Sequence, residues 1–146
     1  MKVNNIKNKL DNGWIIILDR YVGSNLIFQS SKLAKLHSHE LESYIKWTLD
    51  FEYNKLGLPK EDITIYMDMP IDISHNLMLE RKLKSGTSTD GHEENYQYMK
   101  QVESTAKNKI IPFLDYKVVS CIDDKNNIRT KDEIFNDILS IIKKLL

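Results

Sequence analysis

The sequence of 146 residues has one cysteine, three prolines, five glycines and no long apolar run. The lone cysteine, Cys121, excludes an intramolecular disulfide and fits a reducing compartment such as the cytoplasm. The longest apolar run, Trp14–Leu18, is far below the roughly 18 residues that a membrane-spanning helix needs. We therefore expect a cytoplasmic protein that does not cross a membrane.

An excess of charge of either sign is also absent, because 21 basic residues balance 21 acidic ones. Such a chain has no long-range field that would attract nucleic acid or an anionic membrane, so neither is an expected partner. Any recognition of phosphate must come from a few residues placed together. The length is that of one ordinary domain, and we expect residues 1–146 to form a single domain with its own core.

The few glycines are scattered, at Gly13, Gly23, Gly57, Gly86 and Gly91. None of them begins the pattern G-x-x-x-x-G-K-[ST], in which backbone N–H groups and a lysine hold the phosphates of a nucleotide. The sequence therefore does not contain the usual loop for the phosphates of ATP.

Three segments have the pattern of strands: Trp14–Leu18, Ile63–Met69 and Lys117–Ile122. The continuous apolar run of the first predicts a strand covered on both faces, which is typical of parallel sheets. Apolar residues at helical spacing predict helices before, between and after these strands, over about residues 3–10, 41–53, 72–83, 96–110 and 130–145. Strands that alternate with helices favour right-handed crossovers and a three-layer α/β domain with a parallel sheet.

Some residues are expected to cap these helices and others to lie in the core. Asp72 is predicted to cap one helix, and Thr130 and Glu133 to form a capping box at the last, whose inner face includes Leu145. Cys121 is expected to be a small buried apolar residue. The aromatic residues of the helix near residues 41–53 are expected in the core, namely Tyr44, Trp47, Phe51 and Tyr53.

Ligands of such folds bind beyond the carboxyl ends of the strands, where this chain places acidic and basic residues. Asp19 and Arg20 follow the first predicted strand, and Asp68 lies near the end of the second. The planar fork of an arginine matches a phosphate, and a neighbouring aspartate can orient it or help to hold a hydrated magnesium ion. The alternative is a solvated Asp19–Arg20 ion pair that only ends the strand.

The order of three motifs resembles the thymidylate kinase family. The motifs are DRYVGSN after the first predicted strand, FEYNKLGLPKEDITIYMDMP around the second, and ERK followed by DGHEENYQY. The resemblance runs from about Lys2 to the last helix. It implies a P-loop-kinase-like α/β domain, with Mg2+ as cofactor and ATP and thymidylate (dTMP) as ligands. The implied activity, transferase chemistry of nucleotide biosynthesis, moves the γ-phosphoryl group of ATP to dTMP and gives dTDP; a related deoxynucleotide as acceptor stays an alternative.

The resemblance implies roles for residues of the first motif and for those that follow it. Arg20 would bind the phosphate of dTMP, and Asp19 would lie near the phosphates and contact magnesium indirectly. Asn25 would face the thymine ring and Phe28 the sugar, although Asn25 could instead be only a turn or cap residue. The same edge would also include Ser24 and Gln29.

The third motif corresponds to the lid of the family, at about residues 82–92. Arg81 matches the arginine at its start, near ATP, although a cation at the end of a helix also suits the helix dipole. The acidic signature of the lid would be Asp90, His92 and Glu93.

Members of the family carry this phosphate-binding loop, the P-loop, on a strand that precedes the helix corresponding to the one predicted at the start of this chain. We therefore expect the chain to correspond to a C-terminal portion of the family's fold. We also expect it to be nearly inactive alone. In the family that strand lies between those matching Trp14–Leu18 and Ile63–Met69. Without it, the two strands could pair directly, another chain could fill the gap, or the domain could be unstable. An N-terminal fragment is one expected partner and a second copy is another. The alternative is a non-catalytic nucleotide-binding remnant or partner subunit.

Overall fold

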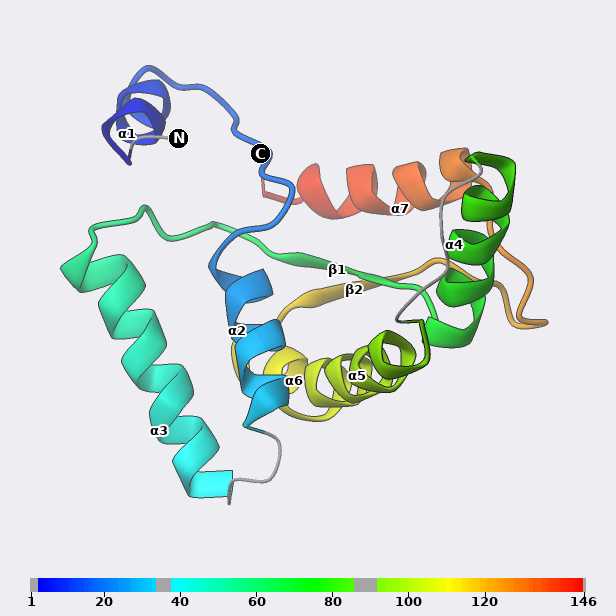
Figure 1. The fold of residues 1–146 in the computed structure, drawn as a ribbon. Helices are drawn as coiled ribbons and strands as arrows, with labels where there is room; N and C mark the ends of the chain where they lie inside the picture. The colour runs from blue at the N-terminus through cyan, green and yellow to red at the C-terminus, as the bar shows by residue number, and fades with distance from the viewer. Residues whose placement is uncertain (1–2, 34–37, 86–91, 146) are drawn as a thin grey trace. The chain divides into compact units, whose positions relative to one another are not determined.

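The computed structural model describes residues 3–33, 38–85 and 92–145, and the side chains of these residues except at 38, 82, 85 and 92–95. It divides into two compact units, Met1–Asp62 and Ile63–Leu146, which are described in turn (Figure 1). Within the described residues, no helix is long and apolar enough to cross a membrane.

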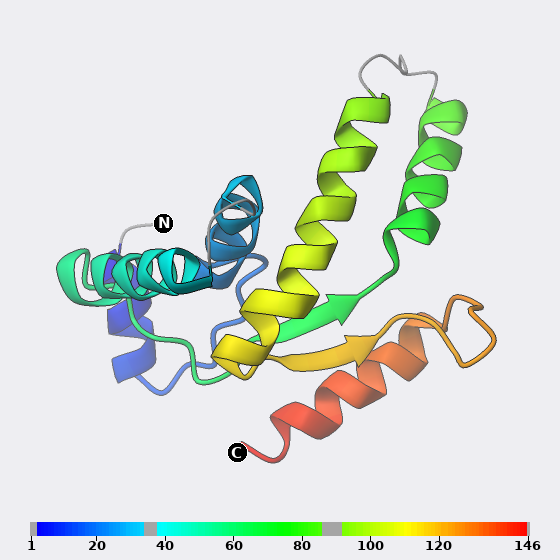
Figure 2. The ribbon, with the colours of Figure 1, turned by 90° about the horizontal axis from the view of Figure 1, so that it is seen from below.

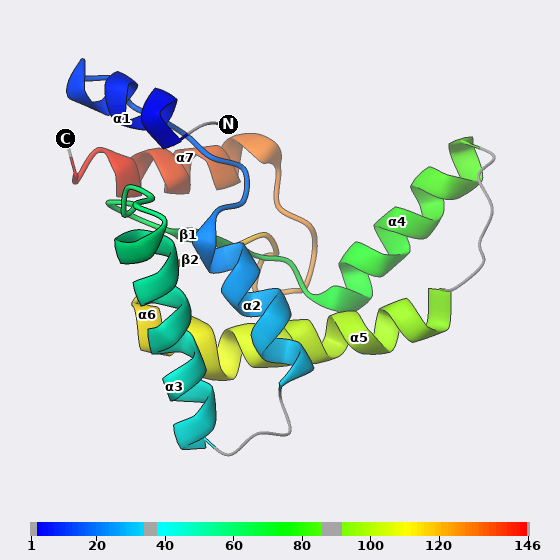
Figure 3. The same ribbon diagram turned by 60° about the vertical axis from the view of Figure 1, so that its left-hand side comes forward.

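The first unit is helical. Its elements are α1 (Val3–Asp11), α2 (Val22–Lys32), α3 (Ser38–Leu49) and the π-helical turn η1 (Asp50–Lys55). Helix α1 ends as predicted, because Gly13 follows it with φ +76, a conformation that favours glycine. Helices α2 and α3 pack against each other (Figure 3).

The core of this unit lies mainly between α2 and α3. Leu26 and Ile27 of α2 and Leu41 and Ile45 of α3 are buried. The spacing of four between Leu41 and Ile45 places them on one face of the helix, as predicted. The hydroxyl residues Ser30 and Ser31 of α2 and Thr48 of α3 are buried as well.

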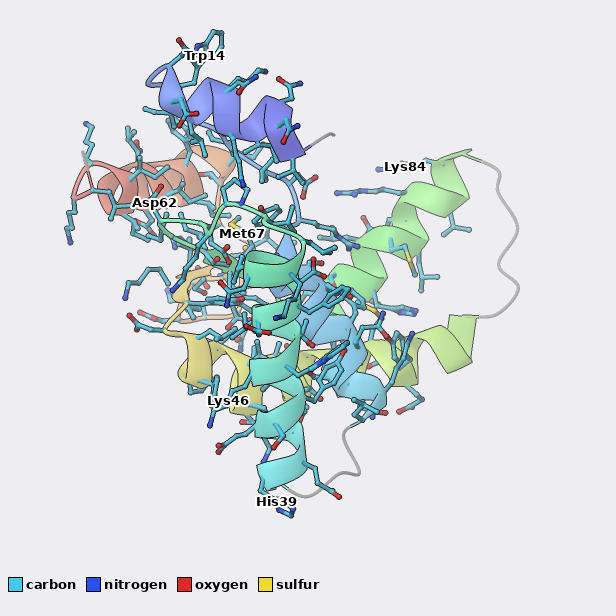
Figure 4. The ribbon with its side chains drawn as sticks, turned by 90° about the vertical axis from the view of Figure 1, so that its left-hand side faces the viewer. Trp14, His39, Lys46, Asp62, Met67 and Lys84 are labelled. Atoms are coloured by element: carbon cyan, nitrogen blue, oxygen red, sulfur yellow. The ribbon has the colours of Figure 1, made fainter. Side chains whose placement is uncertain are left out.

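The prediction of a buried strand at Trp14–Leu18 is wrong. The segment belongs to no strand of the described sheet, and Trp14 and Ile17 are 62% and 83% exposed. Trp14 follows α1 with its side chain pointing away from the ribbon (Figure 4). An extended segment becomes a strand only by hydrogen bonding to a neighbour. Of the three alternatives considered for this segment, direct pairing with the strand near Ile63–Met69 is not found among the described residues.

Two further expectations for this unit are corrected. No helix was predicted over residues 22–32, but Gly23, Ser24 and Asn25 form the first turns of α2. The aromatic residues Trp47 and Phe51 are not in the core, because they are 59% and 40% exposed. Their rings stack on each other outside it, with centroids 5.4 Å apart.

The second unit is an α/β structure. Its elements are β1 (Ile65–Asp68), α4 (Ile71–Ser85), α5 (His92–Thr105), the π-helical turn η2 (Ala106–Ile110), α6 (Ile111–Leu114), β2 (Lys117–Ser120) and α7 (Lys131–Ile142). Strands β1 and β2 are parallel, with Ile65 opposite Lys117 and Asp68 opposite Ser120. Helices α5 and α7 lie on opposite faces of this pair of strands (Figure 2). The predicted α/β class with a parallel sheet is confirmed.

The core of the second unit follows the predicted helical stripe. Val102, Ala106 and Ile110 are buried, and so are Val119 and Cys121 from β2 and the residue after it. Burial raises the pKa of the Cys121 thiol, as expected for a small apolar core residue.

The ends of two helices test the capping predictions. The capping box of Thr130 and Glu133 is confirmed, with the Glu133 N–H donating to the Thr130 hydroxyl at 3.3 Å. Asp72 is not a cap, because α4 already begins at Ile71 and Asp72 lies inside its first turn. Leu145 lies beyond α7 and is 52% exposed, so its predicted place on the inner face is wrong.

Candidate functional site

Arg20 occupies an unusual backbone position directly before α2. Its φ is +70, in the left-handed region that residues with a Cβ seldom adopt. Such strain persists only where the surrounding structure holds it, and it is frequent at ligand sites. The guanidinium carbon lies 5.2 Å from the centroid of the Phe28 ring. The structure thus brings together two residues that the sequence predicted for one substrate.

The other residues predicted to bind the acceptor nucleotide lie on α2. Ser24, Asn25, Phe28 and Gln29 are partly or fully accessible, at spacings of three and four that place them along one side of α2. The opposite side is buried. The first N–H groups of a helix have no acceptor within the helix, and together with an arginine they favour a bound anion. This side of α2 can therefore receive a phosphate at its first turn and a larger group beyond it.

The alternative for Asp19 and Arg20, a mutual ion pair, is not found. Within the described part of the chain, neither side chain forms an ion pair. The donors of Arg20 therefore remain available for a ligand. The described residues also contain no cluster of three or more His, Cys, Asp or Glu placed to hold a metal. Asp19 could supply one carboxylate to a metal ion that a ligand carries.

Tyr21 is a residue of this site whose role the sequence reasoning missed. Its hydroxyl donates to the carbonyl of Pro59 at 2.8 Å and so ties the residue after Arg20 to the loop that follows η1. Burial raises the pKa of Tyr21, and the carboxylates of Glu61 and Glu52 raise it further. The feature of the sequence that could have indicated a role for Tyr21 is its place in the Asp-Arg-Tyr motif, directly after Arg20.

Glu52 was also missed. The Asn25 side-chain nitrogen Nδ2 donates to Glu52 Oε1 at 3.3 Å, across 27 positions of the sequence. Asn25 is neither a cap nor a turn residue, because it lies inside α2, whose N-cap is Tyr21. No local pattern could have predicted this contact, since it depends on how η1 lies against α2.

A hollow in the first unit is separate from these residues. It has a volume of about 550 Å3 and is lined by Lys46, Leu49, Asp50, Tyr53, Asn54, Leu58 and Lys60. None of the predicted acceptor residues lines it. The candidate site is therefore the exposed side of α2 rather than this hollow.

In the second unit, Asp68 ends β1 at the carboxyl edge of the sheet. Its Oδ1 lies 2.7 Å from Lys107 Nζ, which also lies 3.0 Å from Glu103 Oε1. Burial alone would lower the pKa of Lys107, but hydrogen bonds to Asp68 and Glu103 raise it. The Asp68 carboxylate is therefore held by an ammonium group from η2.

The structure describes only part of the segment that was predicted to lie near the phosphate donor ATP. Arg81 is exposed on α4, in keeping with either reading of its role. Asp90 lies outside the described residues, and so do the side chains of His92 and Glu93, which begin α5.

A polar cluster joins the two helices that flank residues 86–91. The Tyr96 hydroxyl of α5 donates to Asp72 Oδ1 of α4. Lys100 Nζ lies 3.4 Å from the same carboxylate and 4.7 Å from the centroid of the Tyr96 ring. The hydrogen bond from Tyr96 lowers the pKa of Asp72. These contacts hold α4 and α5 together.

Comparison with known proteins agrees with the motifs. A "Probable thymidylate kinase" from Thermococcus kodakarensis is 25% identical over 141 residues, which are 97% of this chain and 58% of that protein. A thymidylate kinase from Mycobacterium tuberculosis is 28% identical over 82 residues, which are 56% of this chain and 37% of that protein. The chain thus spans less than two thirds of the length of these relatives. No solved structure matches it.

The family model gives the broader match. The model of thymidylate kinase matches residues 2–129, well over half of the chain. This range includes the Asp-Arg-Tyr motif, the parallel strands and the α4–α5 pair, and it supports a P-loop-kinase-like α/β fold. The chain belongs to the thymidylate kinase family.

Proposed function

We propose that the side of α2 described above binds the acceptor nucleotide of a phosphoryl transfer from ATP to dTMP. Arg20 would hold the phosphate of dTMP, with Ser24 and the first N–H groups of α2 beside it. Asn25 would face the base and Phe28 the sugar. Family membership supports a kinase of nucleoside monophosphates, and dTMP as acceptor is the finer proposal.

One observation supports this proposal above the others. Arg20 is held at φ +70 with its guanidinium over the ring of Phe28, and it forms no ion pair with a described residue. A strained arginine with available donors is unfavourable for folding alone, but it is favourable where an anion binds.

Binding of dTMP to the chain, measured by calorimetry, tests the acceptor role. We expect Arg20→Ala to weaken binding about tenfold or more, because a charged hydrogen bond to phosphate is lost. Lys32→Ala is the matched control, since it removes one positive charge from the other end of α2. Equal losses in the two variants would show that only the net charge matters and would contradict the assignment of Arg20.

The donor side is proposed separately. The chain contains no glycine-rich phosphate loop, so we propose that transfer requires a polypeptide that supplies one. Magnesium would then come with ATP, and Asp19 and Arg81 would act near its phosphates. We expect the chain alone to turn over far more slowly than the roughly 1–100 per second of typical kinases. Turnover in that range, in a coupled assay with ATP and dTMP, would contradict this.

A second candidate is a non-catalytic nucleotide-binding subunit. It is favoured by the grouping of the residues assigned to dTMP on α2 or directly before it, without a phosphate loop for ATP in the chain. Addition of an N-terminal fragment of a complete relative distinguishes the two. Restored turnover supports a divided kinase, whereas binding of dTMP without turnover supports the binding subunit.

A further inference from the structure

The contact between Asn25 and Glu52 fixes the orientation of a carboxamide. Asn25 Nδ2 lies 3.3 Å from Glu52 Oε1. A carboxylate has only acceptors, so the amino end of the carboxamide must face it. The carbonyl oxygen Oδ1, on the other branch of the group, is then turned away from Glu52. The chemistry of the pair thus determines which end of Asn25 is offered to a ligand.

Glu52 is itself held in place. It lies in η1, and wide π-helical turns of this kind are frequent at functional sites. The neighbouring Tyr53 hydroxyl donates to Glu61 Oε2 at 2.6 Å, which ties η1 to the chain that follows it. The Tyr21 hydroxyl donates to the Pro59 carbonyl, and Asn25 donates to Glu52, so the start of α2 is tied to η1 and to the loop after it. Both partners of the contact are therefore supported within one unit.

We propose that Glu52 is a positioning residue, which orients Asn25 so that its Oδ1 accepts the N3–H of a 4-oxo pyrimidine. This inference rests on the function proposed above, in which Asn25 faces the base. Thymine and uracil carry a hydrogen on N3, whereas cytosine has a lone pair there. An acceptor with a fixed orientation attracts the first two bases and repels the third. Glu52 thus contributes to the choice of acceptor nucleotide without touching it.

The hydrogen bond between Asn25 and Glu52 contributes little to the stability of the fold. Asn25 is exposed, the hydrogen bond is long, and accessible polar contacts add little to stability. If Glu52 only supported the fold, its replacement would lower the urea midpoint of unfolding and would weaken the binding of all nucleotides equally. If Glu52 orients Asn25, its replacement by glutamine changes the preference between bases. A glutamine at position 52 can donate a hydrogen bond as well as accept one, so it allows the Asn25 carboxamide to bind in either orientation.

The test compares the dissociation constants of dTMP and deoxycytidylate for the full chain by calorimetry. We expect the unsubstituted chain to prefer dTMP by about fivefold or more, as one net hydrogen bond provides. Glu52→Gln should remove most of this preference without changing the urea midpoint of unfolding. Glu42→Gln is the matched control, because it removes one carboxylate from the same unit at an exposed position that pairs with Lys46 and not with Asn25, and it should keep the preference.

A double variant shows whether Glu52 acts through Asn25. Asn25→Ala should lose the preference by itself, and Glu52→Gln should add nothing to it, because the two residues form one unit. The inference is overturned if Glu52→Gln keeps the ratio or weakens both nucleotides equally. It is also overturned, with the phosphate role of Arg20 intact, if the unsubstituted chain binds both nucleotides equally well. Failure to bind either nucleotide overturns the proposed function together with this inference.

Discussion

Replacement of Lys107 by methionine tests the polar network at the end of β1. Lys107 Nζ lies 2.7 Å from Asp68 Oδ1 and 3.0 Å from Glu103 Oε1. The side chains of Lys107, Asp68 and Glu103 are 36%, 26% and 22% exposed, so the network is partly shielded from water. Methionine keeps most of the apolar stem but removes the ammonium group. Two nearby carboxylates then face each other without a cation.

The expected loss of stability follows from these contacts. A hydrogen bond to a charged group contributes about 1.5–3 kcal/mol when it is shielded. Because Lys107 is more than a third exposed, solvent screening reduces each contact by roughly half. Two such contacts give a decrease of about 2 kcal/mol in the free energy of unfolding, including some repulsion between the carboxylates.

Lys46→Met is the matched control, because Lys46 also pairs with a glutamate four residues before it. That pair is 3.8 Å apart with side chains 67% and 53% exposed, so its loss should change the free energy by less than about 0.5 kcal/mol. Both variants are unfolded in urea and followed by far-ultraviolet circular dichroism. Both tryptophans, Trp14 and Trp47, lie in the first unit, so fluorescence reports that unit separately. Equal midpoints for the two variants would refute the reasoning.

Four further changes test other parts of the structure. Ser30→Ala should raise the free energy of unfolding by about 1 kcal/mol, because its hydroxyl is buried without a hydrogen-bond partner in the described structure; urea unfolding measures this, and a loss would contradict it. Ile17→Thr should change stability by less than about 0.5 kcal/mol, because Ile17 is 83% exposed; a loss of several times that amount would mean that the residue is buried in solution. Thr130→Ala should lower thermal stability by about 1 kcal/mol through loss of the capping box of α7; an unchanged melting temperature would argue against the cap. Stability should also fall as the pH rises above the ordinary pKa values of 9.0 for Cys121 and 10.0 for Tyr66. Burial raises both pKa values in the folded chain, so the unfolded chain loses these protons first. Denaturation at a series of alkaline pH values checks this, and Tyr66→Phe should flatten the dependence.

The features predicted correctly from the sequence depend on neighbours in the chain. The capping box joins Thr130 to Glu133, three residues away, and the buried stripe of Val102, Ala106 and Ile110 follows the helical repeat. The parallel arrangement of β1 and β2 was also predicted, because a helix between two strands favours it. Local spacing and chain connectivity are sufficient for such predictions.

The features that were missed depend on contacts between distant residues. The segment with glycine, serine and asparagine at its start was not predicted as a helix, but it forms α2 and packs against α3. The roles of Tyr21 and Glu52 arise from contacts with Pro59 and Asn25 across 38 and 27 positions. The motif could assign a ligand to Asn25, but it could not show which end of the carboxamide the ligand would meet.

The segment Trp14–Leu18 shows most clearly what an apolar pattern can and cannot determine. The run of five apolar residues indicates that the segment can form a strand with both faces covered. In the structure the segment has no regular secondary structure, and Trp14, Ile15, Ile17 and Leu18 are exposed. The apolar pattern is a property of the segment, whereas pairing and burial require a neighbouring strand and packed faces. The pattern therefore indicated a strand that this segment does not form. Arg20 and Tyr21, directly after it, owe their positions to α2 and to the loop at Pro59 instead.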